Sequence, residues 1–379
     1  MKRMCFLILC CAVMLGSLPA AALADGPHVE AKSAVLMEIA TGKILCEQDA
    51  HIPLPPASVT KVMTMLLIME AIDSERIHWE DMVTVSDTAA AKGGSQVFLK
   101  VGETMSVQDM VKSIAVSSAN DCACAMAEHL EGSEQAFVDK MNQKAQSLGM
   151  KDTHFVNCTG LDDAPEAKEH LTSAYDIALM SRELLYKHPD IKKYTTIWMD
   201  TIRNGAFGLS NTNKMVRFYK GCTGLKTGFT SAAGYCLSAS AKRDNMELAA
   251  VVMGCETPQK RLNACKQLLD YGFSSYGLVM PKLNGPVTVP VELGKAPVAA
   301  AEPAEFQPML IDKGQMSLIR QEIEKVPSVQ APVSMGQKLG TLKIMAGDQI
   351  LAEIPLLATA PVEKLSWWQI FKNLLAFGF

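Results

Sequence analysis

The stretch PLPPASVTKVMTMLLIMEAI occupies residues 53–72 of the chain. Its prolines disfavour a helix before Ser58, whereas the residues from Val59 to Ile72 are rich in Met and Leu and almost uncharged. This composition predicts a buried helix that starts near Ser58. Ser58 and Lys61 are three residues apart, so such a helix places them on one face, and no other serine of the chain has a lysine at this spacing.

The pair Ser58 and Lys61 is typical of a serine nucleophile with a neighbouring base. A serine hydroxyl is a poor nucleophile until a base takes its proton. The apolar helix around Met63 and Met65 disfavours the ammonium form of Lys61, and a second cation, for which Lys226 is the candidate, would lower the lysine pKa further. Alone, the same spacing also arises by chance from a buried serine and an exposed lysine.

A second short motif, Ser118-Ala119-Asn120, follows downstream. A hydroxyl at Ser118 can relay a proton between Lys61 and a leaving amine, while the Asn120 amide holds a substrate carbonyl. As isolated residues, these side chains would more often form a helix cap.

A third motif, Lys226-Thr227-Gly228, falls on a predicted strand. Gly228 lacks a side chain, so a substrate backbone can approach closely and pair with the strand edge, with Lys226 and Thr227 facing a carboxylate. The backbone N–H groups of Ser58 and Phe229 are the expected donors to an oxyanion. An ordinary strand with an exposed lysine is the alternative for this motif alone, but three motifs in this order are far more specific than any one.

The periodicity of the remaining sequence predicts an α/β sandwich around one antiparallel sheet. Short apolar segments at 34–37 and 43–46 flank a glycine turn and predict a hairpin. Helices are expected at 107–131, 134–148, 173–186 and 259–271, and strands at 224–228, 234–241 and 248–254.

Composition excludes several classes of function. The 379 residues carry a formal net charge of −4 without a block of like charges, so nothing favours a nucleic-acid partner. The seven histidines are scattered, without an H-E-x-x-H motif or a C-x-x-C pair. We therefore expect neither a metal site nor a cofactor.

The N-terminus predicts a secretory signal peptide over residues 1–24. Lys2 and Arg3 precede an apolar run at 4–18, which is short for a spanning helix, and the small residues Ala22-Leu23-Ala24 suit cleavage. Cys10 and Cys11 lie inside the apolar run without the small residues of a lipoprotein site. We therefore expect an exported chain that begins near Asp25.

Eight of the eleven cysteines lie beyond the predicted signal peptide. Their spacing is not that of a disulfide framework, and their apolar surroundings predict buried free thiols. Oxidising compartments usually favour pairing, so this many free thiols would hint at an anaerobic source.

Three segments are expected after the signal peptide. A catalytic domain spans 25–278, and a small β-rich domain at 279–360, without histidine or cysteine, acts as a spacer, with strands at 287–291, 339–345 and 350–357 and a loop at 294–304. The last segment, 361–379, is an amphipathic helix. Its aromatic face predicts that residues 364–379 lie in a membrane interface, although docking on the preceding domain is the alternative.

The three motifs and their order resemble those of the low-molecular-mass penicillin-binding proteins, the serine D-alanyl-D-alanine carboxypeptidase family. The resemblance covers nearly the whole exported chain and implies a penicillin-recognising, β-lactamase-like transpeptidase fold of α/β (α+β) class with an antiparallel sheet and a helical subdomain. It implies removal of the terminal D-alanine from peptidoglycan stem pentapeptides through an acyl-enzyme, and binding of β-lactams. The location it implies is extracytoplasmic or periplasmic, on the outer face of the cytoplasmic membrane.

The same resemblance assigns roles to individual residues. Ser58 is the nucleophile, Lys61 the base, and Ser118 and Asn120 serve proton relay and positioning. The substrate-binding residues are Lys226, Thr227, Gly228, Phe229 and Arg261, of which Arg261 would bind the terminal carboxylate. The family often carries histidine after the third motif, whereas this chain has Phe229, which can offer only its backbone N–H to the oxyanion.

Three alternatives stay open. A class A β-lactamase uses S-D-N and a glutamate-activated water, but Ala119 takes the middle position here, and no E-x-x-x-N occurs between Asn120 and Lys226. A D,D-endopeptidase that cuts cross-links would use the same chemistry with another leaving group. A non-catalytic penicillin-binding or envelope scaffold protein is the third alternative. Such a protein would not need the nucleophile, the base, the relay and the third motif, all of which are intact in this chain.

Overall fold

One antiparallel sheet organises the first part of the chain, in the order β2-β1-β9-β8-β7. The computed structural model describes residues 26–280, 283 and 285–377, so the predicted signal peptide lies outside the described residues. The predicted hairpin is confirmed, because β1 pairs with β2 across the Gly42 turn. The strands predicted at 234–241 and 248–254 are β8 and β9, which pair across a turn at Asp244. The five strands are β1 Ser33–Glu38, β2 Ile44–Gln48, β7 Cys222–Thr230, β8 Gly234–Arg243 and β9 Met246–Cys255.

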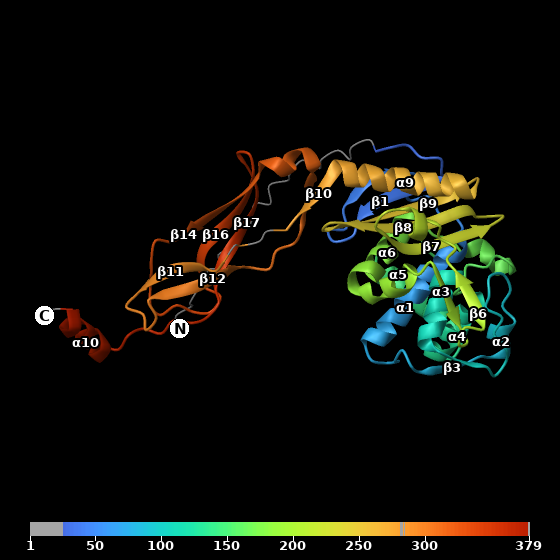
Figure 1. Ribbon diagram of the computed structural model, residues 1–379, viewed down its shortest axis with the longest axis horizontal. Coiled ribbons are helices and arrows are strands. Elements are labelled where there is room, and N and C mark those ends of the chain that lie inside the picture. The colour runs from blue at the N-terminus through green and yellow to red at the C-terminus, as the bar shows by residue number, and fades with distance from the viewer. Residues whose placement is uncertain (1–25, 281–282, 284, 378–379) are drawn as a thin grey trace, which may run out of the picture.

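Helices cover both faces of this sheet. Successive side chains of a strand point to opposite faces, so Ala249 and Val251 of β9 belong to one core while Leu248 and Ala250 belong to the other. The first core contains the α1 to α6 helices, and the second contains α9 (Figure 1). The helices of this domain are α1 Lys61–Asp73, α2 Asp87–Ala90, α3 Val107–Ser117, α4 Asn120–Glu131, α5 Glu134–Ser147, α6 Ala174–Lys187, α7 Lys192–Thr195, α8 Met215–Phe218 and α9 Pro258–Ser275.

The predicted helix near Ser58 is present and begins with a tight turn. A 3-10 turn, η1 (Ala57–Thr60), leads directly into α1, and nine of the thirteen α1 residues are buried. The expected single helix at 107–131 is wrong. Ser118 has a φ of 63°, which a helix interior does not accept, so the segment is divided into α3 and α4 and the S-x-N motif lies at the break.

Short elements complete this domain. Two small two-stranded antiparallel sheets lie outside the main sheet. They are β3 Met82–Thr84 with β4 Thr104–Ser106, and β5 Met199–Ile202 with β6 Phe207–Ser210; two further 3-10 turns are η2 Pro165–Glu169 and η3 Pro189–Ile191.

A second, β-rich domain follows α9 and has its own hydrophobic core. Its main sheet has the order β14-β16-β17-β12-β11-β15, and the pair β10–β13 connects it to the first domain. The expected loop at 294–304 is wrong in part, because Val298–Pro303 pairs as β12 with β11 and β17. The remaining elements are β10 Tyr276–Val279, β11 Val287–Glu292, β13 Met309–Asp312, η4 Lys313–Leu318, β14 Ile319–Lys325, β15 Val329–Gln330, β16 Lys338–Ala346 and β17 Gln349–Ala358.

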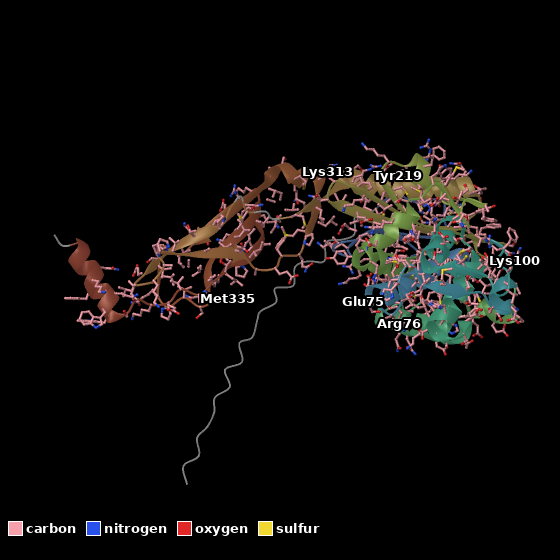
Figure 2. The ribbon with its side chains drawn as sticks, turned by 60° about the horizontal axis from the view of Figure 1, so that its bottom comes forward. Glu75, Arg76, Lys100, Tyr219, Lys313 and Met335 are labelled. Atoms are coloured by element: carbon pink, nitrogen blue, oxygen red, sulfur yellow. The ribbon has the colours of Figure 1, made fainter. Side chains whose placement is uncertain are left out.

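The junction between the domains includes a side-chain contact. Lys313, which Figure 2 shows between the two domains, donates from Nζ to the Phe273 carbonyl of α9 at 2.9 Å. The last helix, α10 (Trp367–Phe377), lies at the end of the molecule farthest from the first domain (Figure 1). Over the described part of the chain, no helix combines the length and the apolar character that a membrane crossing requires.

Candidate active site

The turn that carries Ser58 is held between two glycines. A Cβ atom at Gly228 would lie 2.6 Å from the Pro56 carbonyl oxygen and 3.1 Å from the Ser58 nitrogen. A Cβ atom at Gly160 would lie 1.9 Å from the Ala57 carbonyl oxygen. A side chain at either glycine would clash with this turn, so the strand β7 and the loop around Gly160 can approach Ser58 only because these residues are glycines.

Lys61 lies directly behind Ser58 at the start of α1. Its Nζ is 2.9 Å from Ser58 Oγ and donates to the Thr159 carbonyl at 2.8 Å. The side chain is fully buried, and this burial lowers the pKa of Lys61 to about 7, although Cys158 and Asp121 act in the opposite direction. A near-neutral amine in contact with a hydroxyl can act as a general base.

Lys226 brings a second amine to the same region. It is 1% exposed, and its Nζ donates to the Thr227 carbonyl at 2.9 Å. Burial, followed by the charges of Lys61 and Arg261, holds the pKa of Lys226 well below its ordinary value. Thr227 Oγ1 donates to Thr212 Oγ1 at 2.7 Å. Because β7 is the edge strand of the sheet, its outer side is available to an extended peptide.

The S-x-N motif lies where α3 ends and α4 begins. Ser118 is 3% exposed, but in the described structure its hydroxyl makes no hydrogen bond to either lysine. Asn120 donates from Nδ2 to the Gly93 carbonyl at 2.7 Å, and its backbone N–H donates to the Ser95 carbonyl. Among the described residues, the buried Asn120 Oδ1 has no hydrogen-bond partner.

Arg261 and Phe229 occupy the end of the sheet beside Gly228. Arg261, on α9, is nearly buried and donates from Nη1 to the carbonyls of Gly228 and Cys236 at 3.2 and 3.3 Å. The Phe229 ring is 53% exposed and stacks on Tyr235, with ring centroids 4.2 Å apart. Arg261 thus supports the two strands that flank the third motif, and Phe229 presents an aromatic surface.

Sequence analysis missed several groups that surround these residues. Thr159 supplies the acceptor for Lys61, Gly160 packs on the turn, and Thr212 contacts Thr227. A backbone carbonyl has no side-chain signature, so Thr159 gives no signal in a sequence. Gly160 carries the one usable signal, a glycine in the loop after α5.

The described residues contain no group of three or more histidine, cysteine, aspartate or glutamate side chains that could hold a metal ion. The eight cysteines among them are unpaired, and all but Cys222 are buried.

Comparisons with known proteins show which family this chain belongs to. The family profile described as D-alanyl-D-alanine carboxypeptidase, peptidase S11, matches residues 20–257, and the profile of the penicillin-binding protein 5 C-terminal domain matches residues 284–364. D-alanyl-D-alanine carboxypeptidase DacF of Bacillus subtilis is 43% identical over 98% of this chain and 98% of its own.

Solved structures show the same likeness. Penicillin-binding protein 5 of Haemophilus influenzae is 30% identical, with a TM-score of 0.71 over 89% of this chain and 99% of its own. Penicillin-binding protein D2 of Listeria monocytogenes in its ampicillin-bound form is 31% identical, with a TM-score of 0.59 over 65% of this chain and 98% of its own.

Proposed function

Because this chain belongs to the D-alanyl-D-alanine carboxypeptidases of peptidase family S11, we propose that Ser58 and Lys61 are the nucleophile and the base of that reaction. The protein is a serine-type carboxypeptidase that releases the terminal D-alanine of peptidoglycan stem peptides, and it binds β-lactams. The observation that carries the residue assignment is the 2.9 Å separation between Lys61 Nζ and Ser58 Oγ in a buried site.

The acylation step follows from these positions. Neutral Lys61 takes the proton of the Ser58 hydroxyl as Oγ attacks the carbonyl carbon of the penultimate D-alanine. The oxyanion accepts from the backbone N–H groups of Ser58 and Phe229. As the C–N bond breaks, the leaving D-alanine receives a proton through Ser118. The product is an ester at Ser58.

Deacylation needs an activated water. The chain has no glutamate of the β-lactamase type, so Lys61 or Ser118 must take the proton of the water that attacks the ester. The hydroxyl of Ser58 is then regenerated and the shortened peptide leaves.

The third motif orients the substrate in this proposal. An extended stem peptide adds to the free edge of β7, close to the turn that carries Ser58. The ammonium or amine of Lys226, the Thr227 hydroxyl and the Arg261 guanidinium receive the terminal carboxylate.

D-alanine release by the chain from residue 25 onwards tests the assignment. The substrate is a peptide that ends in D-Ala-D-Ala, and the variants are Ser58→Ala and, as a control, Ser147→Ala on the exposed end of α5. We expect release by the wild type and the control, and none by Ser58→Ala. Release by Ser58→Ala at the wild-type rate would refute the role of this serine.

A cross-linked peptide dimer and a penicillin, assayed in parallel, separate the two enzymatic alternatives. We expect slow or no cleavage of the dimer, and one equivalent of penicillin bound to Ser58 that leaves slowly. Fast turnover of penicillin would indicate a β-lactamase, and preferential cleavage of the dimer an endopeptidase.

We further propose that α10 attaches the protein to the outer face of the cytoplasmic membrane. Trp367, Trp368 and Phe371 are 69%, 65% and 40% exposed, and the Trp367 ring stacks on Phe371. Exposed aromatic side chains on an amphipathic helix favour the interface between lipid headgroups and acyl chains.

Sedimentation with phosphatidylglycerol vesicles tests this attachment. Trp367→Ser combined with Trp368→Ser should remain in the supernatant, whereas Gln369→Ser combined with Asn373→Ser, on the polar stripe, should sediment like the wild type. Deletion of 364–379 should also release the protein from cell membranes. Sedimentation of the double tryptophan variant at the wild-type level would refute the anchor.

Export is the remaining part of the proposal. It rests on the apolar run at 4–18 and the small residues before Asp25. Mass spectrometry of the protein recovered from the cell envelope should give an N-terminus at Asp25, and an intact Met1 would contradict it.

A further inference from the structure

A buried hydrogen-bonded chain lies beneath the nucleophile turn. Thr60 Oγ1, one residue before Lys61, donates to the Ala57 carbonyl at 2.8 Å and lies 2.7 Å from His170 Nε2. The other ring nitrogen, His170 Nδ1, accepts from the Val156 backbone N–H at 3.1 Å. Thr60 is fully buried and His170 is 3% exposed, so no solvent competes for these contacts.

The protonation state of His170 follows from these partners. Nδ1 accepts from a backbone donor, so it carries no proton, and the proton of the neutral ring is on Nε2. Thr60 Oγ1 therefore accepts from His170 and gives its own proton to the Ala57 carbonyl. Burial, aided by the charges of His154 and Lys61, lowers the pKa of His170 to about 4, so the ring is neutral at neutral pH.

The carbonyl at the end of this chain belongs to a strained residue. Ala57 has a φ of 48°, a conformation that L-residues rarely adopt, and it directly precedes Ser58. Strained backbone persists only where surrounding contacts hold it. The Thr60 hydroxyl donates to the Ala57 carbonyl, and Gly160 packs against both groups.

The other end of the chain leads to the base. Val156 starts the loop that contains Thr159, whose carbonyl accepts from Lys61 Nζ. His170 thus connects the loop that orients the Lys61 amine with the turn that orients the Ser58 hydroxyl. Among the described hydrogen bonds, neither His170 nor Thr60 bonds to the Ser58 hydroxyl, which accepts from Lys61.

We propose that neutral His170, acting through Thr60, is a positioning residue that holds Ser58 and Lys61 in register for acylation. This proposal rests on the roles of Ser58 and Lys61 proposed above. Loss of the hydrogen bond between His170 and Thr60 leaves the binding edge of β7 in place. Such a loss should therefore lower the acylation rate and kcat while KM stays near the wild-type value. Misplacement of a reacting group by about 1 Å can cost a hundredfold in rate.

Acylation of the chain from residue 25 onwards by a fluorescent penicillin, beside D-alanine release, tests the proposal. His170→Phe fills the site without hydrogen bonds, and we expect it to acylate at least about tenfold more slowly. His170→Gln keeps a donor and an acceptor and should recover part of the rate. His129→Gln, at an exposed histidine of α4, is the control and should behave as the wild type.

Thr60 gives an independent set of variants if His170→Phe does not fold. Thr60→Val removes the hydroxyl at nearly equal volume and should also slow acylation at least about tenfold, whereas Thr60→Ser should keep most of the rate. Thermal unfolding of every variant separates loss of position from loss of fold.

The results of these measurements distinguish failure of this proposal from failure of the proposed function. If His170→Phe or Thr60→Val acylates at the wild-type rate, the proposal is wrong. The proposal is also wrong if His170→Gln and His170→Phe stay folded and lose activity equally. The hydrogen bonds of His170 would then not matter, and the packing of its ring alone would explain the loss. If the wild type itself releases no D-alanine, the proposed function fails instead.

Discussion

At the scale of single residues, the Lys61 pKa of about 7 and its proposed role as the base together predict the pH range of acylation. The amine acts as a base only when it is neutral, so the rate of Ser58 acylation should rise as pH increases through 7 and level off above 8. Lys61→Arg, which stays charged, should lower the rate by about a hundredfold or more. Penicillin acylation measured from pH 5 to 9 checks both.

An exposed lysine provides the control for this prediction. Lys140→Arg on α5 should show the wild-type pH profile and rate. A profile without a rise near pH 7 in the wild type would show that Lys61 is not the titrating base.

The glycine of the third motif offers a second residue-level prediction. In Gly228→Ala, the new methyl group would press on the Pro56 carbonyl and the Ser58 nitrogen, so we expect acylation to fall by at least about tenfold. Gly208→Ala on β6 is the matched control, because nothing lies within 4 Å of its added Cβ. Equal acylation rates for both variants would contradict the close packing of β7 on the turn.

The sequence predicts the side chains of the proposed site, but it gives no signal for the backbone groups that position them. Ser58 and Lys61 form a recognisable pair because spacing and residue type are visible in the sequence. The Thr159 carbonyl and the strained Ala57 are features of folded backbone, which many sequences can supply. His170 gave no signal because nothing in one sequence distinguishes a hydrogen-bonded core histidine from a surface one.

At the scale of elements, the break between α3 and α4 places the S-x-N motif. Ser118 adopts a left-handed conformation, which glycine accepts at no steric cost. Ser118→Gly and Ser118→Ala both lose the hydroxyl and differ in backbone freedom. Because alanine is strained in the left-handed conformation and glycine is not, we expect the unfolding temperature of Ser118→Gly to be at least as high as that of Ser118→Ala. Thermal unfolding followed by circular dichroism measures the difference.

The same two variants test the proton relay. Both lack the hydroxyl, so both should release D-alanine about a hundredfold more slowly than the wild type, whatever their stability. Wild-type activity in either would leave Ser118 with a purely structural role.

Amphipathic periodicity explains which elements could be predicted. The single helix expected at 107–131 failed because apolar residues continue through the break, and periodicity does not record one left-handed residue. Strand β14 escaped prediction because six of its seven residues are exposed and many are charged, and β12 because its alanines and proline resemble a loop.

At the scale of the whole molecule, the two domains have separate hydrophobic cores. The match to the solved Listeria structure covers 65% of this chain and 98% of that structure. The relative therefore has this fold at about the length of the first domain. We expect a fragment of residues 25–280 to fold and to release D-alanine from a soluble peptide within about twofold of the full-length rate, because no residue of the proposed site lies beyond α9.

The fragment should nevertheless fail to sediment with vesicles, since it lacks α10. Its unfolding should be a single transition, measured by calorimetry. An inactive but folded fragment would show that the second domain contributes to the site rather than acting as a spacer.

The unpaired cysteines affect how the whole molecule tolerates heating. Burial raises the thiol pKa of Cys46, Cys236 and Cys255, so the folded protein is poorly reactive, but unfolding exposes eight thiols at once. In air, oxygen oxidises pairs of these thiols to disulfides, which the remaining thiols can then reshuffle, so activity lost at high temperature should not return on cooling. With a reductant and no oxygen, the same heating should be reversible, so the oxygen content of the buffer would decide how much activity survives a cycle of heating and cooling.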